Sequence, residues 1–291
     1  MKRILFAMTY LVALFFWGCD LPSILSGDDQ SLLSNRNRLD LADTLLFVEV
    51  TGGIAGVSQS LVVDEFGLAL YADSFNPGAK WIIQLSPSEL DSLTNLMLEN
   101  NFFQLKSEYF DEQVEDAFNY SIFFSYQNQE NTVKTNYFGA PDNLKRIIDG
   151  ILQLKSKITN SGLDLKLELS RDEINIGEKV DLKLLITNSS DNPLTLQFST
   201  GQIFDFYAAQ TINKEGSDEN VIWNWAHDKV FTEALWELVL EAGETKSYQV
   251  TWDGHNNTGK LVHGYFIIGA ELPSIPGGSP EHKIFYIGGL K

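Results

Sequence analysis

From about residue 163 to its C-terminal end, the chain alternates apolar and polar side chains in short runs. The clearest runs place apolar side chains two residues apart: Val180, Leu182, Leu184 and Ile186, then Leu194, Leu196 and Phe198, then Tyr248, Val250 and Trp252. A period of two puts these side chains on one face of a β-strand. Turns rich in Gly, Asn and Pro separate the runs. We therefore expect roughly seven to nine antiparallel strands in an all-β immunoglobulin-like sandwich over residues 163–291.

Residues 41–158 mix strand-like and helical patterns. Strand-like runs at residues 45–50 and 60–63 lie on either side of a glycine turn and predict a hairpin. Two further runs, at residues 120–126 and 132–138, are joined by polar residues and predict a second hairpin. These hairpins favour an antiparallel sheet.

Two helices are predicted in the same segment. Ser86 and Glu89 form a capping box with Pro87 at the first helical position, which predicts a helix over residues 87–100. A second helix is predicted to begin at Pro141. Its apolar stripe consists of Leu144, Ile147, Ile148, Ile151 and Leu154. We expect an α+β domain, linked to the sandwich by the polar residues 159–162.

The N-terminal residues have the features of an export signal. Two basic residues precede an apolar run of about fourteen residues, and Gly18 precedes the single cysteine, Cys19. An uncleaved membrane helix is the alternative, but spanning a bilayer takes roughly twenty apolar residues. We expect residues 1–18 to be a lipoprotein signal peptide, Cys19 to be lipidated and residues 19–40 to form a tether. This predicts a lipid-anchored protein of the bacterial cell envelope. The sequence leaves open which membrane leaflet holds the lipid.

Charge and composition narrow the classes of partner. The chain has 39 acidic and 21 basic residues, a formal net charge of −18. This charge disfavours binding to nucleic acid. A lipid on the only cysteine would leave no thiol for a disulfide, so both cores must be stable by packing alone.

No enzyme signature is visible. The four histidines, His227, His255, His263 and His282, lack the spacing of a zinc site, and no nucleophile elbow or phosphate-binding loop is present. Acidic pairs near residues 111–116 lie in a polar stretch typical of a solvated surface. We therefore expect a protein without catalytic residues, metal or cofactor.

The sandwich segment resembles the BsuPI-type intracellular proteinase inhibitor family over residues 164–288. The residues that carry the resemblance lie mainly in the runs at 198–206, 221–225, 229–235 and 241–252. Its signature positions are Gln202, Phe204, Asp205, Phe206, Trp223, Phe231, Gly243, Glu244, Trp252 and Gly259. The resemblance implies an immunoglobulin-like sandwich that inhibits subtilisin-like serine peptidases.

The first segment is similar to the emfourin-like family over residues 41–158. The similarity rests on the glycine turn after residue 50, the helix start at residues 85–90, the corner at residues 101–105 and the residues after Pro141. The resemblance implies inhibition of thermolysin-like metallopeptidases. Residues 73–80 stand out as an insertion.

An inhibitor needs a loop already fixed in its bound shape, because ordering a loop on binding costs affinity. Glycine- and proline-rich turns are the candidates. The candidate inhibitory residues are Gly52, Gly53, Ile54, Ala55 and Gly56 in the first segment, and Asp253, His255, Pro273, Ser274, Ile275 and Pro276 in the second. Each turn is alternatively an ordinary hairpin connection.

The tryptophans leave a second function open. Trp223, Trp225, Trp236 and Trp252 lie in the sandwich segment, where they serve either as core residues or as a platform for sugar rings. We therefore expect a membrane-anchored proteinaceous inhibitor of serine peptidases, metallopeptidases or both. The alternative is a non-inhibitory envelope lipoprotein that binds carbohydrate or protein partners.

Overall fold

The computed structural model describes residues 43–53, 56–74, 76–111, 114, 116–211 and 220–289. The predicted signal peptide, Cys19 and the tether lie outside these residues, as do Ile54 and Ala55. Within the described part of the chain, no helix is long and apolar enough to cross a membrane.

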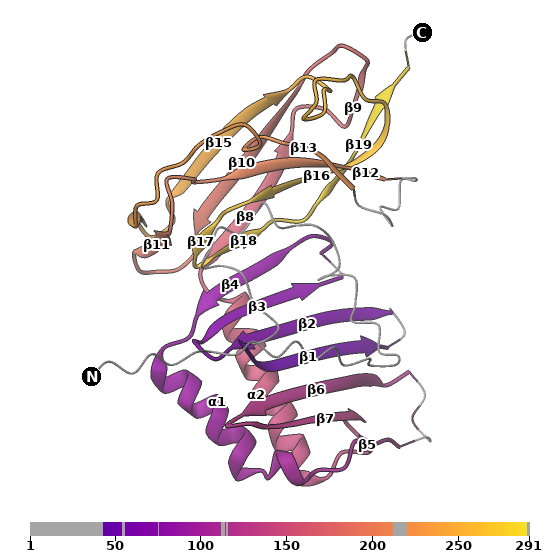
Figure 1. Ribbon diagram of the computed structural model, residues 1–291, viewed down its shortest axis with the longest axis vertical. Helices are drawn as coiled ribbons and strands as arrows, with labels where there is room; N and C mark the ends of the chain where they lie inside the picture. The colour runs from indigo at the N-terminus through magenta and orange to yellow at the C-terminus, as the bar shows by residue number, and fades with distance from the viewer. Residues whose placement is uncertain are drawn as a thin grey trace, which may run out of the picture. The chain divides into compact units, whose positions relative to one another are not determined.

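The N-terminal half combines a mainly antiparallel sheet with two α-helices. Its elements are β1 (Thr44–Gly52), β2 (Val57–Asp64), β3 (Leu68–Asp73), β4 (Lys80–Gln84), α1 (Pro87–Glu99), the 3₁₀ helix η2 (Phe102–Gln104), β5 (Glu108–Tyr109), β6 (Phe118–Tyr126), β7 (Gln129–Asn136) and α2 (Asp142–Thr159). The strands lie in the order β4-β3-β2-β1-β6-β7-β5 (Figure 1). This arrangement confirms the predicted α+β class.

Strand register explains why the helices cover this sheet. Leu46 on β1 lies opposite Val63 on β2 and Phe124 on β6, and all three are buried. Directly paired residues point to the same side of a sheet, so these three form an apolar face. They belong to one core with Met97 of α1 and Ile147 of α2. The helices bury their apolar stripes against this face.

The helix starts follow the predicted local signals. The Ser86 amide donates to the Glu89 carboxylate at 2.8 Å, as a capping box requires. The second helix begins directly after Pro141, which is its N-cap. Helix prediction succeeded here because these signals are local in sequence.

Strand prediction was less complete. The predicted turn at 127–131 is wrong in length: Gln127 and Asn128 alone form it, both with positive φ, and β7 begins at Gln129. Strands β3 and β4 were not predicted, although β4 begins at the end of the supposed insertion. Both strands are short. β3 pairs with β2 and β4 pairs with β3, so they extend the sheet outward from the β1–β2 hairpin.

The C-terminal half is rich in β-strands. Its elements are β8 (Leu163–Leu169), β9 (Glu173–Asn175), β10 (Val180–Asn188), β11 (Leu194–Phe198), β12 (Asp205–Thr211), β13 (Asn220–Asn224), β14 (Trp236–Leu240), β15 (Thr245–Trp252), β16 (Gly264–Glu271), β17 (Ser274–Ile275), β18 (Gly277–Ser279) and β19 (Lys283–Gly288). They form sheets in the orders β15-β10-β8, β14-β11-β17 and β13-β12-β16-β19-β9.

The predicted alternation builds the core of this half. Leu182 and Leu184 on β10 belong to one buried cluster with Phe206 on β12 and Phe266 on β16, which lie in another sheet. The β-rich prediction is confirmed, whereas the immunoglobulin-like topology stays a prediction.

Strand β18 joins the sheet of the N-terminal half. Gly277 lies opposite Ile82, Gly278 opposite Trp81 and Ser279 opposite Lys80 of β4, so β18 is the edge strand next to β4. The two backbones approach each other so closely that a Cβ on Gly278 would stand 1.9 Å from the Lys80 carbonyl oxygen. Residues predicted to belong to the sandwich alone therefore complete the other sheet.

Gly278→Ala tests this junction. The added methyl group collides with the β4 backbone, and overpacking of this kind costs about 1–3 kcal/mol. We expect the free energy of unfolding, measured by chemical denaturation, to fall by that amount. Gly259→Ala is the matched control, because Gly259 also has positive φ (+78°) but has no atom within 4 Å of the added Cβ. Equal losses in both variants would show that backbone strain, and not the junction, is responsible.

Candidate functional site

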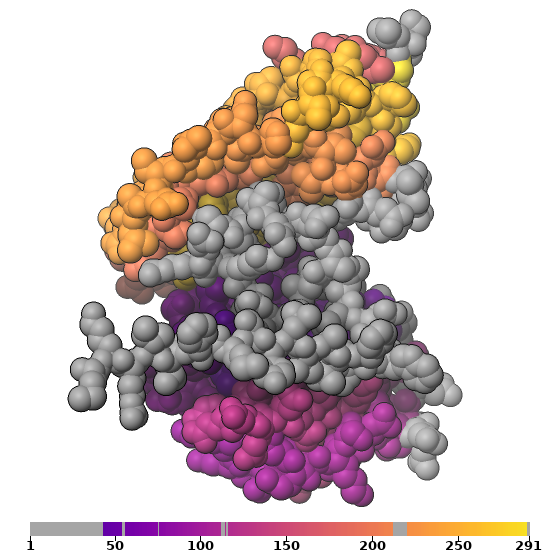
Figure 2. Space-filling view, in the orientation of Figure 1, coloured from indigo at the N-terminus to yellow at the C-terminus, as the bar shows by residue number. Residues whose placement is uncertain are grey.

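Among the described residues of the C-terminal half, the most exposed large apolar side chain lies on a loop between β13 and β14. In this loop, residues 226–235, Val230 is 98% exposed and Leu235 is 73% exposed. The orange part of the chain, to which the loop belongs, lies at the surface in the space-filling view (Figure 2). Val230 and Leu235 are thus two large apolar side chains on one loop whose surface a partner could remove from water.

A buried carboxylate fixes the start of this loop. Asp205, the first residue of β12, is 1% exposed. Its Oδ1 accepts the Ala226 amide at 3.0 Å, and its Oδ2 accepts the Asn224 side-chain amide at 3.1 Å. Burial raises the pKa of Asp205 above its usual value, and these hydrogen bonds oppose that rise. Asp205 therefore ties the end of β13 and the first loop residue to β12.

Two further hydrogen bonds hold the far side of the loop. The Gly201 amide donates to the Thr232 carbonyl at 2.8 Å. The Trp236 indole donates to the Thr200 carbonyl at 2.7 Å. Residues 200–205 thus hold the loop at Ala226 and Thr232, and hold Trp236 directly after the loop.

Aromatic contacts support the middle of the loop from below. Trp225 stacks on Phe204 with ring centres 4.5 Å apart, and Phe231 lies 6.2 Å from the Trp225 ring. The Lys229 ammonium lies 4.3 Å from the centre of the same ring. The side chains on both sides of Val230 therefore turn back onto the protein, while Val230 points away.

A second loop, residues 253–259, contacts the end of β13, just before the first loop begins. The Asn257 side chain accepts the Asn224 amide at 3.0 Å and donates to the Asn224 side-chain oxygen at 3.1 Å. Asp253 accepts the His255 amide at 3.2 Å, and Gly259 closes the turn. Asn224 therefore links the loop that contains the predicted candidates Asp253 and His255 to the end of β13, where the 226–235 loop begins.

The predicted candidate at residues 273–276 lies in a different setting. Ser274 has no exposed surface and pairs with Phe198 of β11, and its hydroxyl donates to the Pro276 carbonyl. Pro273 and Ile275 are partly buried beside it. Together with the β18–β4 pairing, this burial leaves little of the segment free to enter a peptidase cleft.

The glycine turn of the first half is a tight connection between β1 and β2. Gly52, Gly53 and Gly56 all have positive φ, and the Gly56 amide donates to the Gly53 carbonyl at 3.0 Å. The Phe118 ring lies against Gly53. Ile54 and Ala55, the proposed contact residues, lie outside the described residues.

The signature residues of the BsuPI resemblance support this surface more than they form it. Phe206 and Trp252 are buried, Trp223 stacks on Trp252, and the Gln202 side chain donates to the Phe204 carbonyl. Gly243 and Glu244 close the turn before β15. Sequence reasoning recognised Phe231 but missed Val230. The available signal was an aliphatic residue among charged ones, between two tryptophans.

The tryptophan rings favour the core interpretation. Trp223 stacks on Trp252, Trp225 on Phe204 and Trp236 on Phe198, the last with ring centres 4.4 Å apart. A ring face already stacked on the protein is not available to a sugar. The predicted sugar platform therefore loses its main support.

No metal centre is evident in the described residues. No group of three or more His, Cys, Asp or Glu side chains among them is placed to hold a metal ion. His282 is enclosed by the protein, and burial lowers its pKa to about 4, so it is neutral at pH 7. His282 thus lies in a packed junction beside Gly78 and not in an open site.

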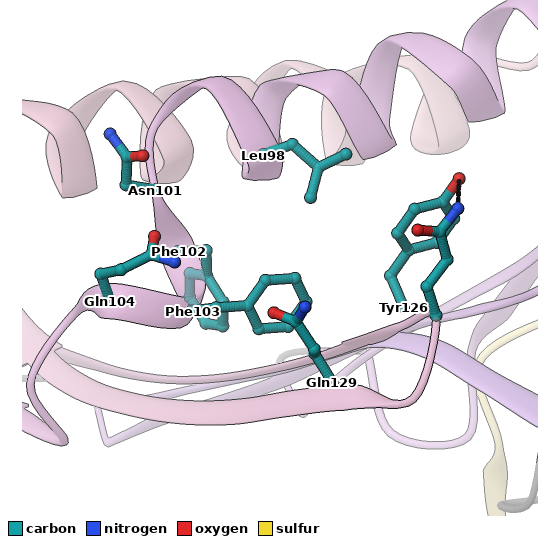
Figure 3. Close-up of a pocket in the computed structure, with 8 residues that line it drawn as sticks. Leu98, Asn101, Phe102, Phe103, Gln104, Tyr126 and Gln129 are labelled. Carbon is teal, nitrogen blue, oxygen red and sulfur yellow. Dashed lines mark hydrogen bonds between the residues drawn. The ribbon is translucent and has the colours of Figure 1, made fainter.

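A shallow pocket near η2 is shown in Figure 3. It measures about 200 Å³ and is lined by amide side chains and rings, among them Asn101, Phe103, Tyr126 and Gln129. The residues that line it include no carboxylate, imidazole or thiol. Ligand sites are usually roughly 300–1,000 Å³, so the pocket is small for a substrate.

A comparison with protein families identifies one match. The model of the BsuPI family, described as intracellular proteinase inhibitors, matches residues 167–276. These residues include Asp205, Trp225 and the whole 226–235 loop. The match suggests a proteinase inhibitor, which acts on a peptidase and has no catalytic role of its own. The emfourin-like resemblance of the first half stays a prediction.

Solved structures give weaker similarities. A Listeria innocua β-glucosidase in complex with laminaribiose is 17% identical over 44% of this chain and 16% of its own (TM-score 0.26). The Pseudomonas fluorescens DNA glycosylase AlkC is 13% identical over 50% of this chain and 38% of its own, with a TM-score of 0.29. The Bacillus subtilis sporulation control protein Spo0M is 12% identical over 43% of this chain and 49% of its own, with a TM-score of 0.30.

The chain thus spans less than half the length of each of these three structures, and the TM-scores are too low to carry an argument. No curated protein matches the chain.

Asp205→Ala tests the support of the loop. The change leaves the Ala226 amide and the Asn224 side chain without their acceptor, and such a loss costs about 1–3 kcal/mol. We expect the free energy of unfolding to fall by that amount and residues 226–235 to become sensitive to limited proteolysis. Asp228→Ala is the control, because the Asp228 side chain is 85% exposed within the same loop. If both variants behave alike, Asp205 does not hold the loop.

Proposed function

We propose that this protein is a proteinase inhibitor and that the 226–235 loop is its inhibitory surface. The observation that carries the proposal is Val230, which is 98% exposed on a loop fixed at both ends. The loop also lies within the residues that match the BsuPI family. The loop at 253–259 is joined through Asn224 to the end of β13, where the 226–235 loop begins.

An inhibitory loop binds more tightly when its backbone is already ordered in the free protein. A loop that is flexible in the free protein loses conformational entropy when it enters a cleft, and this loss weakens binding. Here the buried Asp205 carboxylate, the Gly201–Thr232 hydrogen bond and the Trp225 ring fix the backbone in advance. The exposed valine then buries apolar surface in the peptidase without a large cost in ordering.

Val230→Asp tests the proposal. A carboxylate placed in an apolar pocket loses its hydration, and loss of a central contact costs roughly 3 kcal/mol, equal to about a 100-fold rise in the inhibition constant. We expect the full chain to inhibit a subtilisin-like serine peptidase and this variant to lose that inhibition.

Val239→Asp is the matched control, because Val239 is an exposed valine too, at 47%, but lies on β14, outside the loop. Retained inhibition by Val230→Asp, or equal loss in both variants, would contradict a role for the loop.

An assay of the wild type and of Val230→Asp against thermolysin tests the emfourin-like segment, residues 41–158. We expect both proteins to inhibit thermolysin equally. Absence of thermolysin inhibition would contradict an inhibitory role for this segment.

The proposal includes the predicted lipid anchor. A lipid on Cys19 would hold the inhibitor at the cell envelope, where a tether of about twenty residues lets it sample tens of ångströms. We expect Cys19→Ser to abolish labelling by a fatty-acid probe and to release the protein from the membrane fraction. Continued labelling of Cys19→Ser would contradict lipidation at this residue.

A further inference from the structure

Along the 226–235 loop, Val230 is the most exposed large apolar side chain. Phe231 turns inward to Trp225, and the Thr232 carbonyl is bonded to Gly201. The next large exposed apolar residue, Leu235, directly precedes Trp236, whose indole donates to the Thr200 carbonyl. Val230 is therefore the apex.

The charged neighbour of Val230 is already engaged. The Lys229 ammonium donates to the Trp225 carbonyl at 2.5 Å and lies over the Trp225 ring. Releasing it would cost a cation–π contact and a charge-assisted hydrogen bond. Lys229 is thus held away from the surface that a peptidase would meet, although lysine is the residue that an acidic specificity pocket selects.

The chemistry of valine defines what fits it. Serine peptidases sort their ligands by the pocket beside the scissile bond: an acidic pocket takes Lys or Arg, a deep apolar slot takes aromatic residues, and a small apolar pocket takes short aliphatic residues. Valine is short, apolar and branched at Cβ. Its branching also favours the extended backbone that lies well in a cleft.

We infer that the target of this protein is a serine peptidase with a small apolar specificity pocket, of the elastase kind, and that Val230 is the residue that fills the pocket. This inference rests on the proposed function of the loop. It names the class of peptidase that the loop selects, and it gives Lys229 a part in selection, because its side chain is kept out of the pocket.

The test is a change of selectivity. The full chain, Val230→Lys and Val230→Phe are assayed against elastase, trypsin and chymotrypsin, and inhibition constants are measured. We expect the wild type to inhibit elastase best. Val230→Lys should weaken inhibition of elastase by about 100-fold and gain inhibition of trypsin, and Val230→Phe should shift inhibition toward chymotrypsin. Because Val230 is 98% exposed, neither change threatens the fold.

Val239→Lys serves as the control and should keep the wild-type selectivity. Two failures are distinguishable. If the wild type inhibits these peptidases but Val230→Lys and Val230→Phe leave the order of preference unchanged, the inference about Val230 is wrong and the proposed function stands. If the wild type inhibits none of them, nor subtilisin, the proposed function itself is contradicted.

Discussion

The surface that carries Val230 depends on the buried carboxylate of Asp205. A carboxylate removed from water is costly unless hydrogen bonds replace its hydration. Here the Ala226 amide, the Asn224 side chain and the Phe206 amide supply those bonds. Each partner belongs to a different element, so satisfying one carboxylate sets the position of β12, the end of β13 and the start of the 226–235 loop together.

Asn224 passes this order to the neighbouring loop. Its side chain donates to Asp205 and accepts from Asn257, and its backbone amide donates to Asn257. The two loops are therefore held by one polar network that is anchored in the core. This explains why residues of the family resemblance, such as Asp205 and Trp252, are buried: their role is to hold loops whose outer residues meet the partner.

Local signals allowed much of the fold to be predicted. Pro87 and Glu89 mark the start of a helix within four residues, and the alternation in β10 sets its buried face without reference to any other strand. The pairing of Gly277–Ser279 with β4 was not predictable in this way, because the two segments lie almost two hundred residues apart. The proline- and glycine-rich sequence resembles a free loop, yet most of it is held between sheets.

The candidate site was missed for the same reason. Val230 is distinguished by where its neighbours go: Lys229 and Phe231 both turn toward Trp225. That arrangement depends on Phe204 and Asp205, about twenty-five residues earlier, and no local pattern records it. The sequence pointed to the half of the chain that carries this loop and to the residues that support it, whereas the exposure of Val230 became visible only in the tertiary structure.

The central claim is that residues 226–235 bind the peptidase. Amide hydrogen exchange tests it most directly, measured on the full chain alone and in complex with a serine peptidase that it inhibits. We expect slower exchange in residues 227–235, with a smaller effect in residues 253–259, and unchanged exchange in residues 273–279. Protection confined to residues 52–56 or 273–279, with no change in the 226–235 loop, would contradict the account.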